Sequence, residues 1–137
     1  MTRRESREQA FILIFEKLFN PDLSVAEIVE NALLSESNMP DSFAQELCEK
    51  VYSELEQIDA NISRFTRSWS TSRISKVSLA VLRLAVCEML YYDDIPAKVS
   101  INEAVELAKL YGADNDASFV NGLLGSLSRA KSESTAE

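Results

Sequence analysis

Apolar residues recur at steps of three and four along most of this chain, and this spacing restricts it to helices. Such steps place apolar side chains on one face of an α-helix. Turn formers are scarce, with three glycines and three prolines in 137 residues, whereas a β protein of this length would need more of both. We therefore expect an all-α fold. The clearest stripe predicts one long helix from about residue 41 to 65: Phe43, Leu47, Val51, Leu55, Ile58, Ile62 and Phe65.

The prolines divide the chain into helical blocks. The stretch before Pro21 predicts a first helix over about residues 3–19. A short helix is expected between Pro21 and Pro40, with Ser24 as its N-cap, because a serine hydroxyl can accept a hydrogen bond from a free backbone N–H of the first turn.

The second half of the chain predicts three more helices. Residues 76–92 are apolar almost all round, as in a buried central helix. Ser100–Glu103 fits a capping box that would start the next helix, and Gly112 fits a left-handed C-terminal cap. Asp114 or Asp116 is the expected N-cap of the last helix.

These blocks add up to six or seven helices in two small bundles packed side by side. We expect an N-terminal helical subdomain over residues 1–70 and a C-terminal one over 71–137, joined in a single compact unit. Gly122, inside the last predicted helix, suggests a close helix–helix approach.

Several kinds of chemistry lack their residues. The chain has no histidine, and it shows no metal-ligand spacing, phosphate-binding glycine loop or nucleophile motif. Asp93 and Asp94 form an acidic pair, but nothing nearby in the sequence would raise the pKa of either. We expect no enzyme, no metal site and no cofactor.

The cysteines and the apolar stretches indicate in which cellular compartment the protein is expected. Cys48 and Cys87 each lie within an apolar helical pattern, so we expect buried, reduced thiols and a cytoplasmic protein. The longest apolar-rich stretch contains Arg83 and Glu88 and is too short to span a bilayer, so no membrane association is expected.

The first helix carries the densest positive charge of a chain whose net charge is −8. On a helical wheel Arg3, Arg4 and Arg7 lie on the side of the apolar stripe, and the acids Glu5, Glu8 and Glu16 lie on the other. The arginines would then form a positive lip able to hold phosphates and stack on bases. The alternative is an N-terminal turn that only keeps the chain soluble.

Three stretches resemble the NusB family of bacterial transcription antitermination factors. They are IPAKVSINEAVELAKLYGADNDASFVNGLLG, VLRLAVCEML and RRESREQAFILIF. A NusB-like domain also occurs fused to some rRNA cytosine methyltransferases. The resemblance implies an all-helical fold of two small bundles. It also implies binding of boxA RNA as a heterodimer with NusE, the small-subunit ribosomal protein, within the RNA polymerase antitermination complex that transcribes rRNA operons.

The resemblance also implies site residues. Arg3, Arg4 and Arg7 occupy the family's arginine-rich RNA-binding segment, and four further residues match positions in or near its RNA and partner surface. Phe15, which stands where a tyrosine is common, and Glu88 are assigned to partner binding. For several of these a structural role stays open: a core position for Phe119, a polar capping-box position for Asn102 and a loop cation for Lys98. The four matching positions are Lys98, Asn102, Asn115 and Phe119.

Three functions follow as hypotheses. The first is an RNA-binding antitermination factor, in which a basic partner supplies charge that the interleaved Glu5 and Glu8 remove, and the acidic surface helps to recruit it. The second is a protein-interaction adaptor of the transcription machinery without direct RNA binding. The third, the RNA-binding half of a methyltransferase, is disfavoured because the chain stops about ten residues after its last apolar stripe. Whether the chain forms a homodimer is left open.

Overall fold

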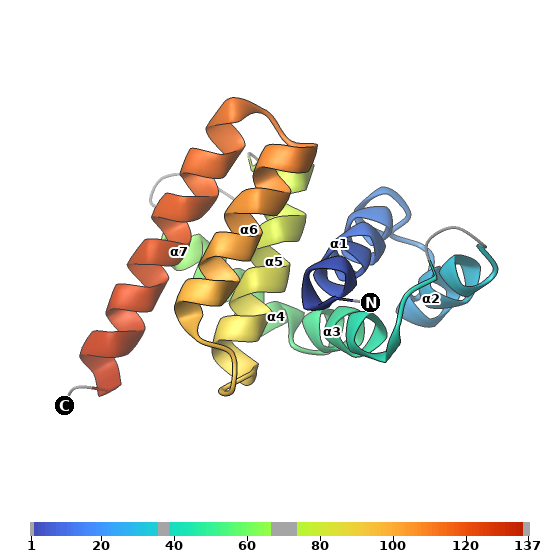
Figure 1. The fold of residues 1–137 in the computed structure, drawn as a ribbon, viewed down its shortest axis with the longest axis horizontal. Helices are drawn as coiled ribbons and strands as arrows, with labels where there is room; N and C mark the ends of the chain where they lie inside the picture. The colour runs from blue at the N-terminus through green and yellow to red at the C-terminus, as the bar shows by residue number, and fades with distance from the viewer. Residues whose placement is uncertain (1, 36–38, 67–73, 136–137) are drawn as a thin grey trace.

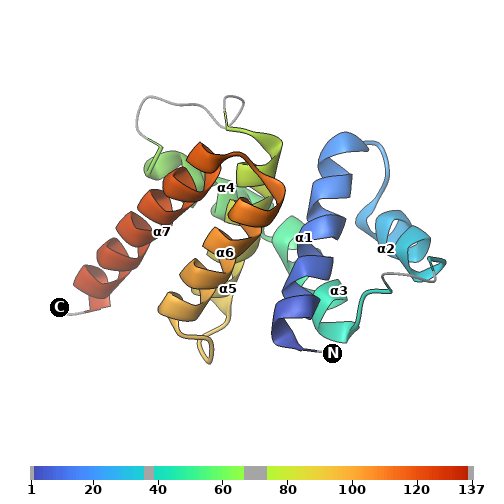
Figure 2. The same ribbon diagram turned by 45° about the horizontal axis from the view of Figure 1, so that its top comes forward.

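A computed structural model describes residues 2–35, 39–66 and 74–135, and every regular element in these segments is an α-helix. Figures 1 and 2 show α1, α2 and α3 grouped on one side and α4, α6 and α7 on the other, with α5 between the two groups. The all-α prediction is confirmed. The helices are α1 (Arg3–Phe19), α2 (Val25–Leu33), α3 (Ser42–Ser53), α4 (Leu55–Arg64), α5 (Lys76–Tyr91), α6 (Ala97–Tyr111) and α7 (Asp114–Thr135).

The first three helices begin at polar caps. The hydroxyl of Thr2 accepts a hydrogen bond from the Glu5 N–H at the start of α1. Ser24 and Glu27 form a complete capping box at α2, as expected for Ser24. Asp41 caps α3 by accepting from the Ala44 N–H at 2.9 Å. Each cap satisfies a backbone donor that would otherwise have no partner within the helix.

The single long helix expected over residues 41–65 is interrupted at Glu54, so that prediction was wrong. Glu54 has φ −112° and ψ 21°, outside the helical range. The Ser53 hydroxyl donates to the Lys50 carbonyl oxygen, which also accepts from the Glu54 N–H. Serine bonding of this kind bends helices. The break turns α4 onto α5, while α3 packs against both α1 and α5.

Helix α5 is the centre of the fold. It packs against α1, α3, α4, α6 and α7, and its residues 78–89 are buried throughout. The Arg83 guanidinium satisfies its buried charge with two hydrogen bonds to the Asp59 carboxylate of α4, at 3.0 and 2.9 Å. Cys48 and Cys87 are free thiols inside this core. No described helix combines the length and the apolar character that a membrane span requires.

The turns before and after α6 differ from the predictions. Helix α6 begins at Ala97 behind Pro96, so Ser100 lies one turn inside the helix and does not start a capping box. Gly112 has φ −110°, which is extended backbone and not a left-handed cap. Glycine is required there because a Cβ would lie 2.7 Å from a carboxylate oxygen of Asp116 and 2.8 Å from the Ala108 carbonyl oxygen.

The start of α7 is fixed by Asp116, which lies inside the helix and is not its N-cap. Its carboxylate accepts from the backbone N–H of Ala113 and from the hydroxyls of Ser75 and Ser78 at the start of α5. Burial acts to raise the pKa of Asp116, but these hydrogen bonds outweigh it and hold the pKa below its ordinary value. Asp114 is likewise the first residue of α7 rather than its cap.

Two further expectations concern packing. A Cβ added to Gly122 would meet nothing within 4 Å, so the close helix approach expected there was wrong. The proposed division between residues 70 and 71 falls outside the described residues and stays a prediction. Around it, α4 from the first half packs on α5 from the second, and one continuous apolar core includes residues from all seven helices of the described segments.

Candidate nucleic-acid interface

The beginning of α1 is fixed to the beginning of α3. The Ser6 hydroxyl donates to the Asp41 carboxylate, and the Gln9 side chain accepts from the Asp41 N–H at 3.1 Å. Burial acts to raise the pKa of Asp41, but the bonds from Ser6 and Ala44 and the charge of Arg3 outweigh it, so the pKa lies below its ordinary value. These contacts hold the amino end of α1 in one orientation.

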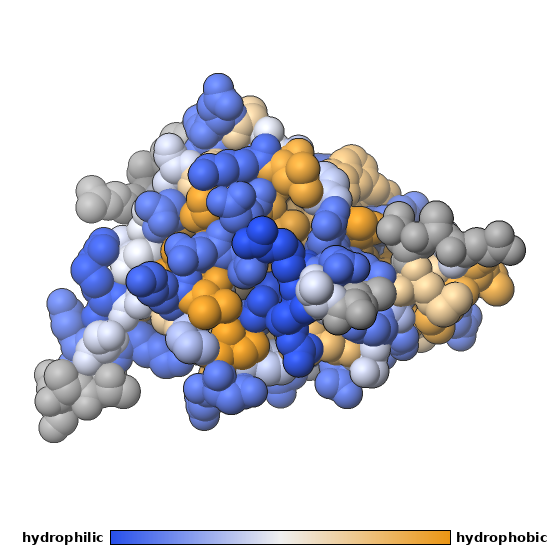
Figure 3. All heavy atoms as spheres, viewed as in Figure 1, coloured by the Kyte–Doolittle hydropathy of each residue, from blue (hydrophilic) through white to orange (hydrophobic). Residues whose placement is uncertain are grey.

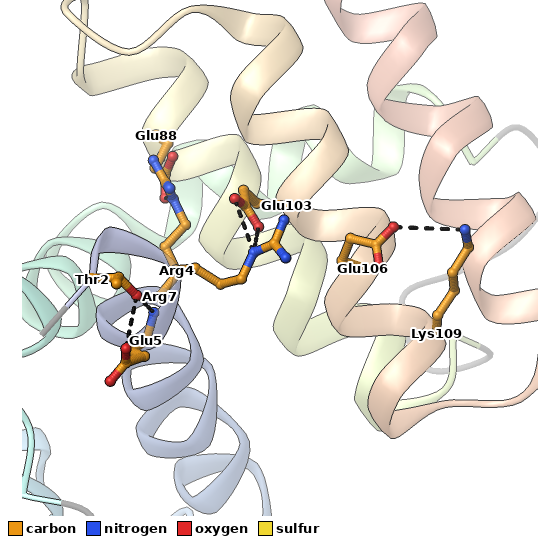
Figure 4. A network of polar contacts seen from close by, with 8 residues as sticks. All are labelled: Thr2, Arg4, Glu5, Arg7, Glu88, Glu103, Glu106 and Lys109. Atoms are coloured by element: carbon orange, nitrogen blue, oxygen red, sulfur yellow. Dashed lines mark hydrogen bonds and ion pairs between the residues drawn. The ribbon is translucent and has the colours of Figure 1, made fainter.

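Arg7 turns inward from α1 into the core. Its Nε donates to the Glu88 carboxylate of α5 at 2.7 Å, and only 5% of the Arg7 side chain and none of the Glu88 side chain is exposed. The Ser100 hydroxyl of α6 donates to the other Glu88 oxygen at 2.9 Å. This network, which we call the buried Arg7 network, joins three helices from both halves of the chain. Figure 4 shows Arg7 pointing at Glu88, away from Arg4.

The buried Arg7 network corrects two assignments. An exposed lip made by all three arginines is wrong for Arg7, whose guanidinium is enclosed and paired. Direct contact between Glu88 and a partner is also wrong, because its side chain is fully enclosed. Both residues instead fix how α1 sits against α5 and α6.

Arg4 lies on the surface, beside α6. Its Nε donates to the Glu103 carboxylate at 3.0 and 3.3 Å, as Figure 4 shows. Arg4, Glu103 and Glu8 line one groove between α1 and α6, together with Leu107 and Leu110. The expectation that Glu8 turns away from the arginines was therefore wrong. The Tyr111 hydroxyl donates to Glu8, and burial and then this acceptor raise the pKa of Tyr111 to about 12.

Arg3 is exposed and makes no ion pair with the described residues. Its guanidinium carbon lies 3.8 Å from the ring centroid of Phe43, at the start of α3. Stacking on a ring uses the flat face of the guanidinium and leaves the N–H groups at its edge free to donate. Arg3 is therefore the best placed of the three arginines for contact with a phosphate.

The remaining residues form two groups at opposite ends of α6. Lys98 and Asn102 are exposed one turn apart on the first half of α6, beside Arg4's partner Glu103. Asn115 and Phe119 line a pocket at the start of α7, beyond the last residue of α6. At 1.5 Å per residue, Lys98 lies about 20 Å and Asn102 about 13 Å from the end of α6 at which the second group begins. Figure 3 shows that strongly hydrophilic side chains run across the face where α1 begins and α6 passes it.

Phe15 belongs to a row of aromatic rings along α1. Its ring centroid lies 5.5 Å from that of Phe11 and 4.9 Å from that of Phe19, and Phe11 also contacts Tyr111 of α6 at 4.8 Å. Phe11 is buried, Phe15 partly buried and Phe19 exposed. The row therefore leads from the core to the surface, and its outer end offers apolar area to a protein partner.

Phe43, Glu103 and Ser100 were given other roles in the sequence analysis, and their contacts with Arg3, Arg4 and Glu88 were missed. Only for Ser100 did the sequence contain a signal. Glu88 lies in an otherwise apolar helix, and a carboxylate buried there needs hydrogen-bond donors from other helices. Within the segments that the structure describes, no group of three or more His, Cys, Asp or Glu residues could hold a metal ion. Among the described residues, the starts of α1 and α6 present the stacked guanidinium of Arg3, the ammonium of Lys98, the paired guanidinium of Arg4 and the amide of Asn102. These groups are suited to phosphates and base edges.

Fold and surface together describe an all-helical two-bundle protein with cationic and amide groups at the start of α1 and α6. Comparison with known proteins specifies the family. The model of the NusB family matches residues 4–129. The transcription antitermination protein NusB of Acetivibrio thermocellus is 44% identical over 135 residues, covering 96% of this chain and 91% of that protein. The chain belongs to the NusB family.

Solved structures show the same similarity in three dimensions. NusB of T. maritima is 38% identical with a TM-score of 0.84, over 94% of this chain and 92% of that one. A chain from a crystal structure of the antitermination factors NusB and NusE in complex with dsRNA is 25% identical with a TM-score of 0.75, over 93% of this chain and 96% of that one.

Proposed function

We propose that this protein is a transcription antitermination factor that binds boxA RNA together with NusE and acts in the cytoplasm on rRNA operons. Membership of the NusB family over residues 4–129 carries this proposal. The solved complex that contains NusB, NusE and RNA supports the choice of both partners. The exposed groups at the start of α1 and α6 provide the donors that an RNA strand needs.

In this proposal the RNA backbone contacts Arg3, Arg4 and Lys98. Asn102 reads a base edge on the same part of α6. Asn115 and Phe119 form a second contact region, and a strand running along α6 would reach both regions. Phe15, the partly buried middle ring of the aromatic row, contacts NusE, while the buried Arg7 network contacts neither partner.

Ion pairs with glutamates reduce the positive charge that two of the arginines can offer to RNA. Arg7 is neutralised by Glu88 and Arg4 by Glu103, so among the described residues at the start of α1 and α6 it is Arg3 and Lys98 that contribute unpaired positive charge. We expect weak RNA binding by the protein alone and stronger binding once a basic partner has joined. Equal affinity for a boxA oligonucleotide with and without NusE would contradict this.

The salt dependence of RNA affinity tests the function. Fluorescence anisotropy of a labelled single-stranded boxA RNA, titrated in the presence of NusE, should give a linear fall of log affinity with log salt, at about −0.7 per phosphate contacted. Arg3→Gln and Lys98→Gln should each reduce the slope by about 0.7. Arg64→Gln, at the far end of α4, is the control with the same charge change.

The paired state of Arg4 and Arg7 also favours a second candidate, an adaptor of the transcription machinery that binds proteins only. A salt slope near zero with NusE present, together with intact binding of NusE, would favour this adaptor.

A further inference from the structure

The three arginines of α1 are in three different states. Arg7 is enclosed with Glu88, and Arg3 is stacked on Phe43 with its edge free. Arg4 is the intermediate case, since 69% of its side chain is exposed while it is held by a carboxylate. Among the three arginines of α1, Arg4 is therefore the exposed one whose availability depends on a carboxylate of the same chain.

The geometry shows which of the two partners is fixed. Only 18% of the Glu103 side chain is exposed, against 69% for Arg4. Glu103 lies on α6, and Ser100, one turn earlier on the same helix, donates a hydrogen bond to Glu88 in the buried Arg7 network. Both Glu103 oxygens lie near one nitrogen of Arg4, the Nε, at 3.0 and 3.3 Å. The carboxylate is the stationary group, and Arg4 is the long side chain that could leave it.

This arrangement works against an incoming phosphate. The terminal nitrogens of Arg4 make no hydrogen bond to the described residues, so a phosphate could reach them. It would then lie roughly one guanidinium width from the Glu103 carboxylate, and like charges at that distance repel. A phosphate must either accept this repulsion or draw Arg4 away from Glu103.

We propose that Glu103 is an affinity-setting residue, which competes with the RNA backbone for Arg4 and lowers the affinity of the protein for RNA. This inference rests on the proposed RNA-binding function and adds to it a residue that acts against binding. Removing its charge frees Arg4 without disturbing the buried Arg7 network. The contrary role, in which Glu103 orients Arg4 for phosphate, predicts the opposite effect of the same substitution.

The test measures affinity for a labelled single-stranded boxA RNA by anisotropy, using the full chain with and without NusE. Glu103→Gln should bind about two- to fivefold more tightly, the range expected when one partly exposed ion pair is removed. Glu106→Gln is the matched control, because it changes the net charge equally, lines the same groove and faces Lys109 rather than Arg4. It should change affinity by less than about 1.5-fold, because charges that are not in contact are screened by salt.

A double-mutant cycle assigns the effect to Arg4. Arg4→Gln should weaken binding, and in that background Glu103→Gln should give no more than the control effect. The inference is overturned if Glu103→Gln binds no better than Glu106→Gln, if it binds more weakly than wild type, or if its gain persists without Arg4. In those cases wild-type binding still supports the proposed function, whereas absence of RNA binding by every variant overturns both.

Discussion

Removing Arg7 should destabilise this protein far more than removing any exposed arginine. Arg7→Met keeps roughly the volume of the side chain and its helix propensity but leaves the Glu88 carboxylate enclosed, with the Ser100 hydroxyl as its remaining hydrogen-bond donor among the described residues. Breaking a buried pair by removing one partner costs about 3–5 kcal/mol, because the other charge stays desolvated and uncompensated.

The magnitude converts to a large thermal shift. Unfolding entropy scales with length, so a chain of 137 residues has roughly 0.3 kcal/mol/K near its midpoint. The loss therefore corresponds to a Tm lower by about 10–17 °C. Urea denaturation followed by far-UV circular dichroism gives the free energy of unfolding, and an unchanged m-value would show that two-state unfolding is retained.

A second substitution separates the charge effect from simple loss of packing. Glu88→Leu in the Arg7→Met background replaces the whole pair by apolar groups, and it should restore most of the lost stability. Arg4→Met is the exposed control, for which a loss below about 1 kcal/mol is expected. A loss below 1 kcal/mol for Arg7→Met, or strictly additive effects in the double variant, would refute the reasoning.

Three further predictions concern Asp116, the two cysteines and two of the glycines. The pKa of Asp116 is lowered in the folded state, so this residue stabilises the protein above about pH 4 and loses that contribution as the pH falls through the lowered pKa. The difference in unfolding free energy between wild type and Asp116→Ala should therefore become smaller as the pH is lowered from 7 to 3. Burial raises the pKa of both Cys48 and Cys87 to about 12, so a thiol reagent at pH 8 should react about a hundredfold or more slowly with native than with denatured protein. Gly112→Ala should cost about 1–3 kcal/mol because its Cβ would clash with Asp116, whereas Gly122→Ala, with open space around it, should stabilise α7 by about 0.5–1 kcal/mol in the same urea assay.

Periodicity was sufficient for most of the helices and failed where one side chain redirects the backbone. The bounds of α1 and the Ser24 N-cap of α2 follow from local residues, and both were predicted. The apolar stripe from Phe43 to Phe65 continues across Glu54 without a change of step, so it gives no sign of the break between α3 and α4. That break depends on the Ser53 hydroxyl and on the need of α4 to cover α5, which is a tertiary requirement.

The start of α6 shows a local motif overridden by its surroundings. Ser100 and Glu103 have the spacing of a capping box, but Pro96 starts the helix one turn earlier. Ser100 instead donates a hydrogen bond to the buried Glu88, and Glu103 accepts one from Arg4. The same two residues satisfy partners on other helices, and sequence spacing alone contains no information about those partners.

The arginines of α1 show the same limit at the candidate site. A helical wheel gives the direction of each side chain around the axis, and it correctly placed Arg4 and Arg7 on the side of the core. It gives no depth, because depth depends on whether another element supplies a counter-charge. Glu88, 81 positions further along the chain, supplies it for Arg7. An arginine in line with an apolar stripe, combined with a glutamate in an otherwise apolar helix, is therefore better interpreted as a buried pair than as two surface contacts. The RNA-binding capacity proposed here rests on the arginines for which the fold provides no enclosed acid.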